Sequence, residues 1–338
     1  MKTLICNSPR HLEYSQATPP QLTKGHALLK IKRIGICGTD LHAFEGTQPF
    51  FNYPRILGHE LAAELVDIDS PADFRQGEIV TFIPYFYCGK CIACRNGKPN
   101  CCTGIQVCGV HIDGGMAEYL SVPSYSLVHG DGLHADSLAL IEPLAIGAHA
   151  VSRAGIQPGE FVLVVGAGPI GLGTMEFARI AGGRVIALDV NDARLAFCKD
   201  KLNVAHIIRS TGTDVVARLK DITDGDMPTV VMDATGSLKA INQAFHYMAH
   251  TGRYILVGLQ KEDISFSHPE FHQREGTLMS SRNATRRDFE HVMESLKAGR
   301  IDPTSYITHR VMFDQVKQNF ESWLDPATGV IKAMVELI

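Results

Sequence analysis

The sequence lacks several features that mark whole classes of protein. None of its apolar stretches extends uncharged over the about 18 residues that a membrane-spanning helix needs. The first residues, MKTLICNSPRHLEYSQ, lack the apolar core of a secretory signal. Internal repeats and low-complexity linkers are also missing. We therefore expect a globular, cytoplasmic protein that works without a membrane.

An excess of positive charge is missing as well. The 338 residues include 32 Lys and Arg against 36 Asp and Glu, so the formal net charge is -4 and the pI is near 6.4. This balance argues against nucleic acid or anionic membranes as partners, because both attract basic proteins. With 45% hydrophobic and 20% charged residues, the composition is that of an ordinary globular protein. The length favours two domains.

Cysteine is present in nine copies, but its pattern does not predict disulfides. Disulfides belong mainly to exported proteins, and five of the nine cysteines fall between Cys88 and Cys102. The stretch CGKCIACRNGKPNCC spaces Cys88, Cys91, Cys94 and Cys102 so that four thiolates can surround one zinc ion tetrahedrally. A closed shell leaves no position for a substrate, so this zinc would be structural. Spacing alone does not choose between Cys102 and its neighbour Cys101 as the fourth ligand.

The pattern of apolar residues, glycines and prolines changes near residue 158. The earlier part has many Gly and Pro breaks and short strand-like segments, such as residues 26–34 and 60–68, which indicates a β-rich domain with functional loops. The later part alternates strands with helices, as in FVLVVGAG followed by PIGLGTMEFARIAG, and predicts a doubly wound parallel sheet. A helix, DFEHVMESLKAG, and a strand-like end, IKAMVELI, come last, and we expect this tail to rejoin the first domain.

The sequence thus predicts an α/β protein of two domains. Residues 1–150 and 285–338 form the β-rich domain, with the cysteine lobe at about residues 86–104, and residues 151–284 form the parallel-sheet domain. The strand GRYILVGL is expected near an edge of the parallel sheet, where it would be available for pairing.

A glycine pattern marks a dinucleotide site. Gly166, Gly168 and Gly171 form G-x-G-x-x-G at a strand-to-helix turn, where the backbone can approach a pyrophosphate and the helix N-terminus faces its charge. Asp189 ends the next strand, and its carboxylate would accept hydrogen bonds from ribose hydroxyls and repel a 2′-phosphate, which favours NAD over NADP. Arg194 lies nearby in the sequence and is the residue that could meet such a phosphate instead. The expected cofactor contacts are Gly166, Gly168, Pro169, Ile170, Gly171, Asp189, Arg194, Thr235 and Val257.

The remaining candidate ligands are dispersed along the chain. They are Cys37 in GICGTDLH, His59 and Glu60 in ILGHELAAEL, and Glu142 in ALIEPLAIGAHA. Together with the cysteine cluster, DGGMAEYLSVP, VVGAGPIGLG and DATG, these stretches resemble the zinc-dependent medium-chain dehydrogenases almost from end to end. Within that family they resemble the polyol and threonine dehydrogenase branch. Gly38 follows the cysteine, and a Glu-Pro pair beginning at Glu142 stands where simple alcohol dehydrogenases have a second cysteine.

The resemblance implies a GroES-like β-rich catalytic domain, a Rossmann coenzyme domain and two zinc ions per chain. It implies that Cys102 completes the structural shell. It also implies that Cys37, His59 and a glutamate bind a catalytic zinc. Glu60 and Glu142 compete for that role, and Glu60 is favoured as the direct ligand.

Three residues beside Cys37 take roles from the same resemblance. Asp40 would orient the imidazole of His59, which fixes the nitrogen that faces the metal. Thr39 and His42 would relay the substrate proton to solvent. The implied reaction is the transfer of a hydride from a secondary alcohol to NAD, with zinc stabilising the alkoxide.

A narrower resemblance is carried by TQPFFNYPRILGHE and PEFHQREGTLMSSRNAT. These stretches are similar to a bacterial sugar-acid group that includes L-galactonate and L-gulonate 5-dehydrogenases. The likeness implies oxidation at C5 of a hexonate, whose distant carboxylate needs a cation or a set of amides to hold it. Arg282 is the candidate anchor, Asn283 a candidate partner for a hydroxyl, and His111 a further candidate pocket residue.

Other functions remain open at this point. A general polyol dehydrogenase acting on sorbitol-like substrates, or an L-threonine dehydrogenase, is the alternative within the same chemistry. A non-catalytic, zinc-stabilised NAD-binding sensor is the alternative from another class, and the complete set of Cys37, Thr39, Asp40, His59 and Glu60 argues against it. A zinc-ribbon nucleic-acid binder is disfavoured by the acidic balance. The resemblance also implies a homodimer or a homotetramer.

Overall fold

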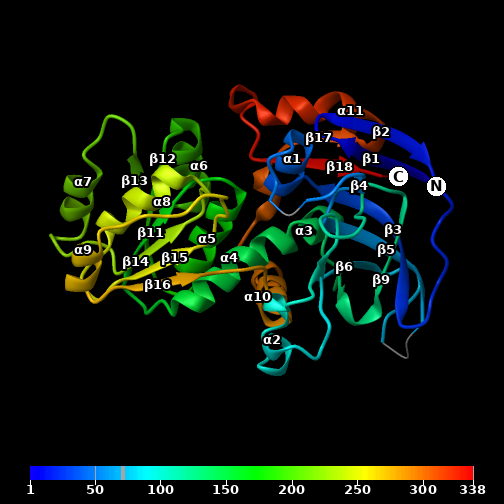
Figure 1. The fold of residues 1–338 in the computed structure, drawn as a ribbon, viewed down its shortest axis with the longest axis horizontal. Helices are drawn as coiled ribbons and strands as arrows, with labels where there is room; N and C mark the ends of the chain where they lie inside the picture. Colours follow the sequence, from blue (N-terminus) through cyan, green and yellow to red (C-terminus); the bar gives the residue numbers. More distant parts are fainter. Residues whose placement is uncertain (50, 70–72, 338) are drawn as a thin grey trace. The chain divides into compact units, whose positions relative to one another are not determined.

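The computed structural model describes residues 1–49, 51–69 and 73–337, so Phe50 of the stretch TQPFFNYPRILGHE lies outside the described residues. Two compact units make up the chain. Unit 1 comprises Met1–Glu142 and Thr285–Ile338, and unit 2 comprises Pro143–Ala284. Figure 1 colours the chain by sequence, and the final red strand, β18, lies among the blue strands of unit 1. No helix in the described ranges is long and apolar enough to cross a membrane.

Unit 1 is built mainly from strands. Its largest sheet runs in the order β10-β6-β5-β3-β18-β17, with β9 also paired to β3, and smaller sheets are β2-β1-β4 and β7-β8. The strands are β1 (Lys2–Ser8), β2 (His11–Gln16), β3 (His26–Gly35), β4 (Arg55–Ile56), β5 (Glu60–Ile68), β6 (Ile79–Phe82), β7 (Tyr85–Phe86), β8 (Gln106–Val107), β9 (Tyr119–Pro123), β10 (Leu127–His129), β17 (Ile307–Met312) and β18 (Lys332–Glu336). Its helices are α1 (Gly38–Glu45), α2 (Ile92–Arg95), α3 (Ala135–Ala139), α10 (Arg286–Lys297) and α11 (Val316–Asn319), and α4 (Ile141–Ala154) begins where unit 1 ends.

The tail of the chain completes the main sheet of unit 1. Strand β18 pairs antiparallel with β3, Met334 opposite Gly35, and parallel with β17. Its apolar residues, such as Met334 and Val335, are fully buried in the core of this unit. This pairing places the last strand beside the segment that leads into α1.

A cluster of ion pairs also ties the tail to the rest of unit 1. Asp136 at the start of α3 accepts hydrogen bonds from Arg33 Nε of β3 at 2.8 Å and from Arg310 Nη2 of β17 at 2.5 Å. Arg310 also donates to Glu336 at 2.9 Å. Burial raises the pKa of Asp136, but the hydrogen bonds from Arg310 and Arg33 outweigh it and lower the pKa below its usual value. The carboxylate is therefore ionised at neutral pH.

Unit 2 is a six-stranded parallel sheet with helices in the crossovers. The strand order is β13-β12-β11-β14-β15-β16, the order of a Rossmann fold. The strands are β11 (Phe161–Val165), β12 (Arg184–Asp189), β13 (His206–Arg209), β14 (Val230–Asp233), β15 (Arg253–Leu256) and β16 (Thr277–Ser280). The remaining helices are α5 (Pro169–Ile180), α6 (Asp192–Leu202), α7 (Val215–Ile222), α8 (Leu238–Ala244) and α9 (His268–Gln273). The predicted combination of a β-rich domain and a doubly wound sheet is confirmed.

The edge of the parallel sheet differs from the expectation. The strand of GRYILVGL is β15, but β16 pairs along its outer side, Leu278 opposite Tyr254, and is the terminal strand of the described sheet. The sequence of β16, TLMS, is short, and Thr277 and Ser280 are exposed at its two ends. Such a segment has no clear apolar alternation, so the pattern did not mark it as a strand.

We predict that Asp136→Asn lowers the free energy of unfolding by about 1–3 kcal/mol at pH 7, because two charged hydrogen bonds are lost. A lowered folded-state pKa means that the stabilisation is complete above the unfolded-state pKa and is lost as pH falls through the folded-state value. The deficit measured by urea denaturation should therefore be equal at pH 8 and pH 6 and shrink only below about pH 4. The exposed Asp221, paired with Arg218 at 3.4 Å, provides a control, since Asp221→Asn should cost less than about 1 kcal/mol. A deficit that grows as pH falls would contradict this account.

Candidate active site and its two metal centres

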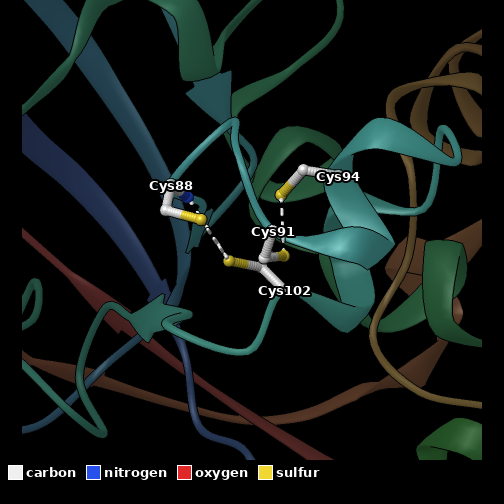
Figure 2. A group of neighbouring side chains, drawn as sticks. All are labelled: Cys88, Cys91, Cys94 and Cys102. Carbon is white, nitrogen blue, oxygen red and sulfur yellow. Dashed lines mark hydrogen bonds between the residues drawn. The ribbon is translucent and has the colours of Figure 1, made fainter.

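The four-cysteine lobe is organised as a closed metal shell. The sulfur atoms of Cys88, Cys91, Cys94 and Cys102 all lie within 4.8 Å of one another, and Figure 2 shows them facing a common centre. Cys91 Sγ is 3.5 Å from Cys94 Sγ, and Cys102 Sγ is 3.4 Å from Cys88 Sγ. Four zinc–sulfur bonds of about 2.3 Å fit such a cluster. Cys101 is exposed and is not part of the group, and none of the cysteines forms a disulfide in the described chain.

A second cluster joins two separate segments of unit 1. The ligand atoms of Cys37, His59 and Glu60 also lie within 4.8 Å of one another. Cys37 is the N-cap of α1, while His59 and Glu60 stand at the start of β5. Gly58 makes the approach to β5 possible with a φ of 95°, and a Cβ there would meet the backbone nitrogen of Met116 at 3.3 Å. One thiolate, one imidazole and one carboxylate form a donor set that suits a zinc ion with an open position.

Asp40 supports both segments of this cluster. Its carboxylate accepts hydrogen bonds from the backbone N–H groups of Cys37 at 3.0 Å and Gly58 at 3.1 Å. Its Oδ1 lies 3.7 Å from Nδ1 of His59, which is in ion-pair range but longer than a hydrogen bond. Nδ1 is buried and has no hydrogen-bond partner in the described residues. This geometry leaves the other ring nitrogen for a metal.

The charges around His59 favour a cation at this place. Burial lowers the pKa of the imidazole, but the Cys37 thiolate and the Asp40 carboxylate outweigh burial and raise the pKa well above its usual value. A buried group surrounded by anions needs positive charge nearby. A zinc ion would provide that charge, so the residues fit the metal that the donor set suggests.

Glu60 is held by a buried lysine. Lys332 Nζ donates to both carboxylate oxygens of Glu60, at 2.7 and 2.6 Å, and to the carbonyl of Ile36 at 3.1 Å. The side chain of Lys332 is 2% exposed and that of Glu60 is fully buried. Gly35 makes room for the carboxylate, because a Cβ at Gly35 would clash with Oε2 of Glu60. Glu60 is therefore close to Cys37 and His59, but both of its oxygens accept hydrogen bonds from the ammonium group of Lys332.

Glu142 has a different partner. Its Oε1 accepts a short hydrogen bond from the hydroxyl of Tyr85, and both side chains are buried. Burial raises the pKa of Glu142 to about 6, while the charge of His59 acts to lower it. Burial and the neighbouring carboxylate raise the pKa of Tyr85 well above its usual value, so the hydroxyl stays protonated and donates. Glu142 does not belong to the group of ligand atoms within 4.8 Å that contains Glu60.

The two relay candidates lie on one helix. Thr39 and His42 are three positions apart in α1, which places them on the same face. Thr39 is half-buried, and the side chain of His42 is 59% exposed, 3.6 Å from the carboxylate of Glu45. The face of α1 that carries Thr39 therefore also carries an exposed imidazole.

The glycine pattern of unit 2 forms the expected strand-to-helix turn. Gly166 has a φ of 99°, and a Cβ on Gly171 would clash with the carbonyl of Gly166, so both positions require glycine. A Cβ on Gly168 would meet open space, with Nη1 of Arg194 at 4.0 Å as its nearest neighbour. This space fits a pyrophosphate at the N-terminus of α5, which begins with Pro169 and Ile170.

Asp189, the last residue of β12, is hydrogen-bonded to the glycine turn. Its carboxylate accepts hydrogen bonds from the backbone nitrogens of Ala167 at 2.6 Å and Asn191 at 2.8 Å. Thr235 donates to Asp233, and the nitrogen of Val257 donates to the carbonyl of the same residue at 2.9 Å. The predicted coenzyme residues therefore lie at the carboxyl ends of β11, β12, β14 and β15, where Rossmann folds bind dinucleotides.

The predicted substrate residues lie in both units. Arg282 is exposed and Asn283 has a φ of 52°, and they follow β16 in unit 2. In unit 1, Nδ1 of His111 accepts a hydrogen bond from the backbone nitrogen of Val107 at 3.0 Å, which leaves Nε2 as the protonated nitrogen of the neutral ring. The roles of these residues stay predictions.

The sequence matches two families, described as an alcohol dehydrogenase GroES-like domain over residues 23–131 and a zinc-binding dehydrogenase over residues 169–298. It is 44% identical over 336 residues to the L-galactonate-5-dehydrogenase of Escherichia coli K12, covering 99% of this chain and 98% of that protein. The chain belongs to the zinc-binding dehydrogenases.

Two further relatives extend this likeness. The dehydrogenase is 31% identical over 304 residues to a sorbitol dehydrogenase of Halalkalibacterium halodurans, with 88% of each chain covered. A solved structure from Escherichia coli CFT073, described as a short chain alcohol dehydrogenase complexed with NADH, matches with a TM-score of 0.93 and 29% identity, covering 100% of this chain and 99% of that one. The predicted family and enzyme class are confirmed, and zinc and NAD as cofactors agree with these matches.

Two residues of the dehydrogenase's cluster were not predicted from the sequence. Lys332 interrupts the apolar run of IKAMVELI, and a charged residue in such a strand is a signal of a buried partner. Tyr85, in FIPYFYC, carries no comparable signal, because a tyrosine fits any half-buried strand.

We predict that Cys102→Ser leaves the dehydrogenase with one zinc per chain and that Cys101→Ser leaves two. Of these two cysteines, only Cys102 belongs to the closed sulfur cluster. A serine oxygen is a poor replacement for a thiolate in a structural zinc site. Metal analysis of the two purified variants beside the wild type measures the difference. Loss of a zinc from Cys101→Ser, with full occupancy in Cys102→Ser, would contradict the assignment.

Proposed function

We propose that this zinc-type sugar-acid or polyol dehydrogenase oxidises the C5 hydroxyl of a hexonate, such as L-galactonate or L-gulonate, with NAD. The proposal is carried by the 44% identity, over nearly the whole chain, to a protein named for L-galactonate. The buried cluster of Cys37, His59, Glu60 and Asp40 supports the chemistry, because these residues supply metal ligands and a group that orients one of them.

Four side chains of unit 1 are candidates to hold the catalytic zinc. Cys37 and His59 would each give one ligand atom. Glu60 was favoured as the third from the sequence and lies close enough, but Lys332 engages both of its oxygens. Glu142 has one oxygen on Tyr85 and is the carboxylate that could offer its second oxygen without separating a buried ion pair. We therefore propose Glu142 as the direct ligand, with Glu60 as the alternative.

The protein's own residues would move the substrate proton. When bound, zinc supplies Lewis-acid polarisation of the hydroxyl and NAD supplies the hydride acceptor. Thr39 Oγ1 would accept the hydroxyl proton while its own hydroxyl proton leaves toward the exposed imidazole of His42, which would pass a proton to water. Asp40 holds the backbone of Cys37 and Gly58, which keeps the ligands in place during the reaction. The glycine turn and Asp189 would bind and orient NAD.

The dehydrogenase is also proposed to be a cytoplasmic homodimer or homotetramer. Strand β16 ends the parallel sheet of the described chain, so its outer backbone groups would be available to a second copy. A polyol or L-threonine dehydrogenase is the competing activity, and the likeness to a sorbitol dehydrogenase supports the former. A non-catalytic NAD-binding sensor is the alternative without turnover.

We predict that NAD reduction is faster with L-galactonate or L-gulonate than with sorbitol or L-threonine. The comparison is kcat/KM over stereoisomeric hexonates, hexitols and threonine, each with NAD and with NADP. NAD should be preferred, because Asp189 would repel a 2′-phosphate. Higher kcat/KM on sorbitol or threonine would overturn the substrate proposal, and no turnover on any of these compounds would favour the sensor.

We predict that Arg282→Ala raises KM for the hexonate about 10- to 100-fold, because an arginine–carboxylate interaction of about 1.5–3 kcal/mol is lost. The matching uncharged hexitol should be affected far less. Arg287→Ala, at another exposed arginine five positions further on, serves as the control and should leave both values unchanged. Equal losses on hexonate and hexitol would contradict the role of Arg282 as a carboxylate anchor.

A further inference from the structure

A short two-stranded neck connects the four-cysteine lobe to the rest of unit 1. It consists of β7 and β8, in which Tyr85 pairs with Val107 and Phe86 with Gln106. Beside it, the nitrogen of Cys108 donates to the carbonyl of Pro84 at 3.0 Å. A ladder of two residues per strand is too small to hold itself together in water. The neck is therefore held by its packing in the core of unit 1, where Phe86 and Cys108 are buried, and by what closes the chain beyond it.

The lobe is joined internally by its sulfur cluster. Its regular structure is limited to the four residues of α2 and a 3-10 turn at Pro99–Cys101, and helices this short do not form alone. Cys88 lies two positions after β7, and Cys102 lies four positions before β8. The nitrogen of Cys88 donates to Sγ of Cys102 at 3.3 Å, so the metal shell joins the two ends of the neck directly.

Tyr85 connects this neck to the second metal cluster. Its side chain is 4% exposed, and its hydroxyl donates to Glu142, which is 5% exposed. Glu142 is the carboxylate proposed above as a ligand of the zinc held by Cys37 and His59. One buried hydroxyl thus determines which oxygen of Glu142 is engaged and which is available to the cluster.

We propose that Tyr85 is a positioning residue that fixes Glu142 for the catalytic zinc and makes the retention of that zinc depend on an intact four-cysteine lobe. The inference rests on the proposed function in that the cluster of Cys37 and His59 holds zinc with Glu142 as a direct ligand. The lobe then affects more than its own stability. A change in the lobe alters the neck and, through Tyr85, the position of Glu142. Groups that orient metal ligands commonly change metal affinity by about 10- to 100-fold when they are removed.

The first test compares Tyr85→Phe with Tyr87→Phe. Tyr87 follows the same neck, but its side chain is 41% exposed and packs on Tyr125 at a ring distance of 5.0 Å. Tyr85→Phe should bind two zinc ions but hold one of them about 10- to 100-fold more weakly in competition with a chelator. In the cobalt-substituted variant, the absorption bands of the site with mixed ligands should shift while those of the four-thiolate site stay. Tyr87→Phe should match the wild type in both measurements, and a wild-type result for Tyr85→Phe would overturn the proposal.

The second test asks whether the lobe acts through Tyr85. Cys102→Ser should weaken the binding of the remaining zinc by the same factor as Tyr85→Phe. The double variant should show no further loss of zinc affinity, because both changes release the same carboxylate. Cys94→Ser gives the same comparison if Cys102→Ser does not fold. Wild-type affinity at the remaining site, or additive losses in the double variant, would overturn the coupling. These metal measurements need no substrate, so a failure of the proposed dehydrogenase activity is seen separately, in the turnover assays.

Discussion

A buried ion pair between Lys332 and Glu60 holds the metal-binding region of the protein together. The lysine comes from the last strand, β18, and its ammonium group donates to both oxygens of Glu60 and to the carbonyl of Ile36, the residue before Cys37. Both charges are almost completely buried, and removing one partner from such a pair typically costs about 3–5 kcal/mol. The correct placement of Cys37 and β5 therefore requires the last strand, β18.

The two glutamates of this region have different partners. Glu60 faces an ammonium group that neutralises it, and Gly35 leaves the space that its carboxylate occupies. Glu142 faces a neutral hydroxyl from Tyr85, and burial raises its pKa to about 6. A carboxylate that is not hydrogen-bonded to a protein cation is the better partner for a metal cation, because the metal then supplies the neutralising charge. We therefore propose a structural task for Glu60 and a metal-binding task for Glu142.

Local patterns in the sequence predicted the parts of the site that are themselves local. The glycines from Gly166 to Gly171 sit in one turn, and three of the four lobe cysteines lie within seven positions, so spacing was sufficient to predict both. Lys332 is separated from Glu60 by 272 positions, and Tyr85 from Glu142 by 57. These contacts depend on which strands are neighbours in the sheet, and no single-sequence pattern specifies that. The family resemblance named the ligands and Asp40, but not Lys332 and Tyr85, the partners of the two glutamates.

The most direct test of this account is anomalous diffraction at the zinc absorption edge from crystals of the wild-type protein. Two zinc peaks per chain are expected. One should lie among the sulfur atoms of Cys88, Cys91, Cys94 and Cys102. The other should lie within bonding distance of Cys37, His59 and an oxygen of Glu142, with Glu60 still paired to Lys332. A second peak bonded to Glu60, with Lys332 displaced from it, would contradict the assignment of the two glutamates.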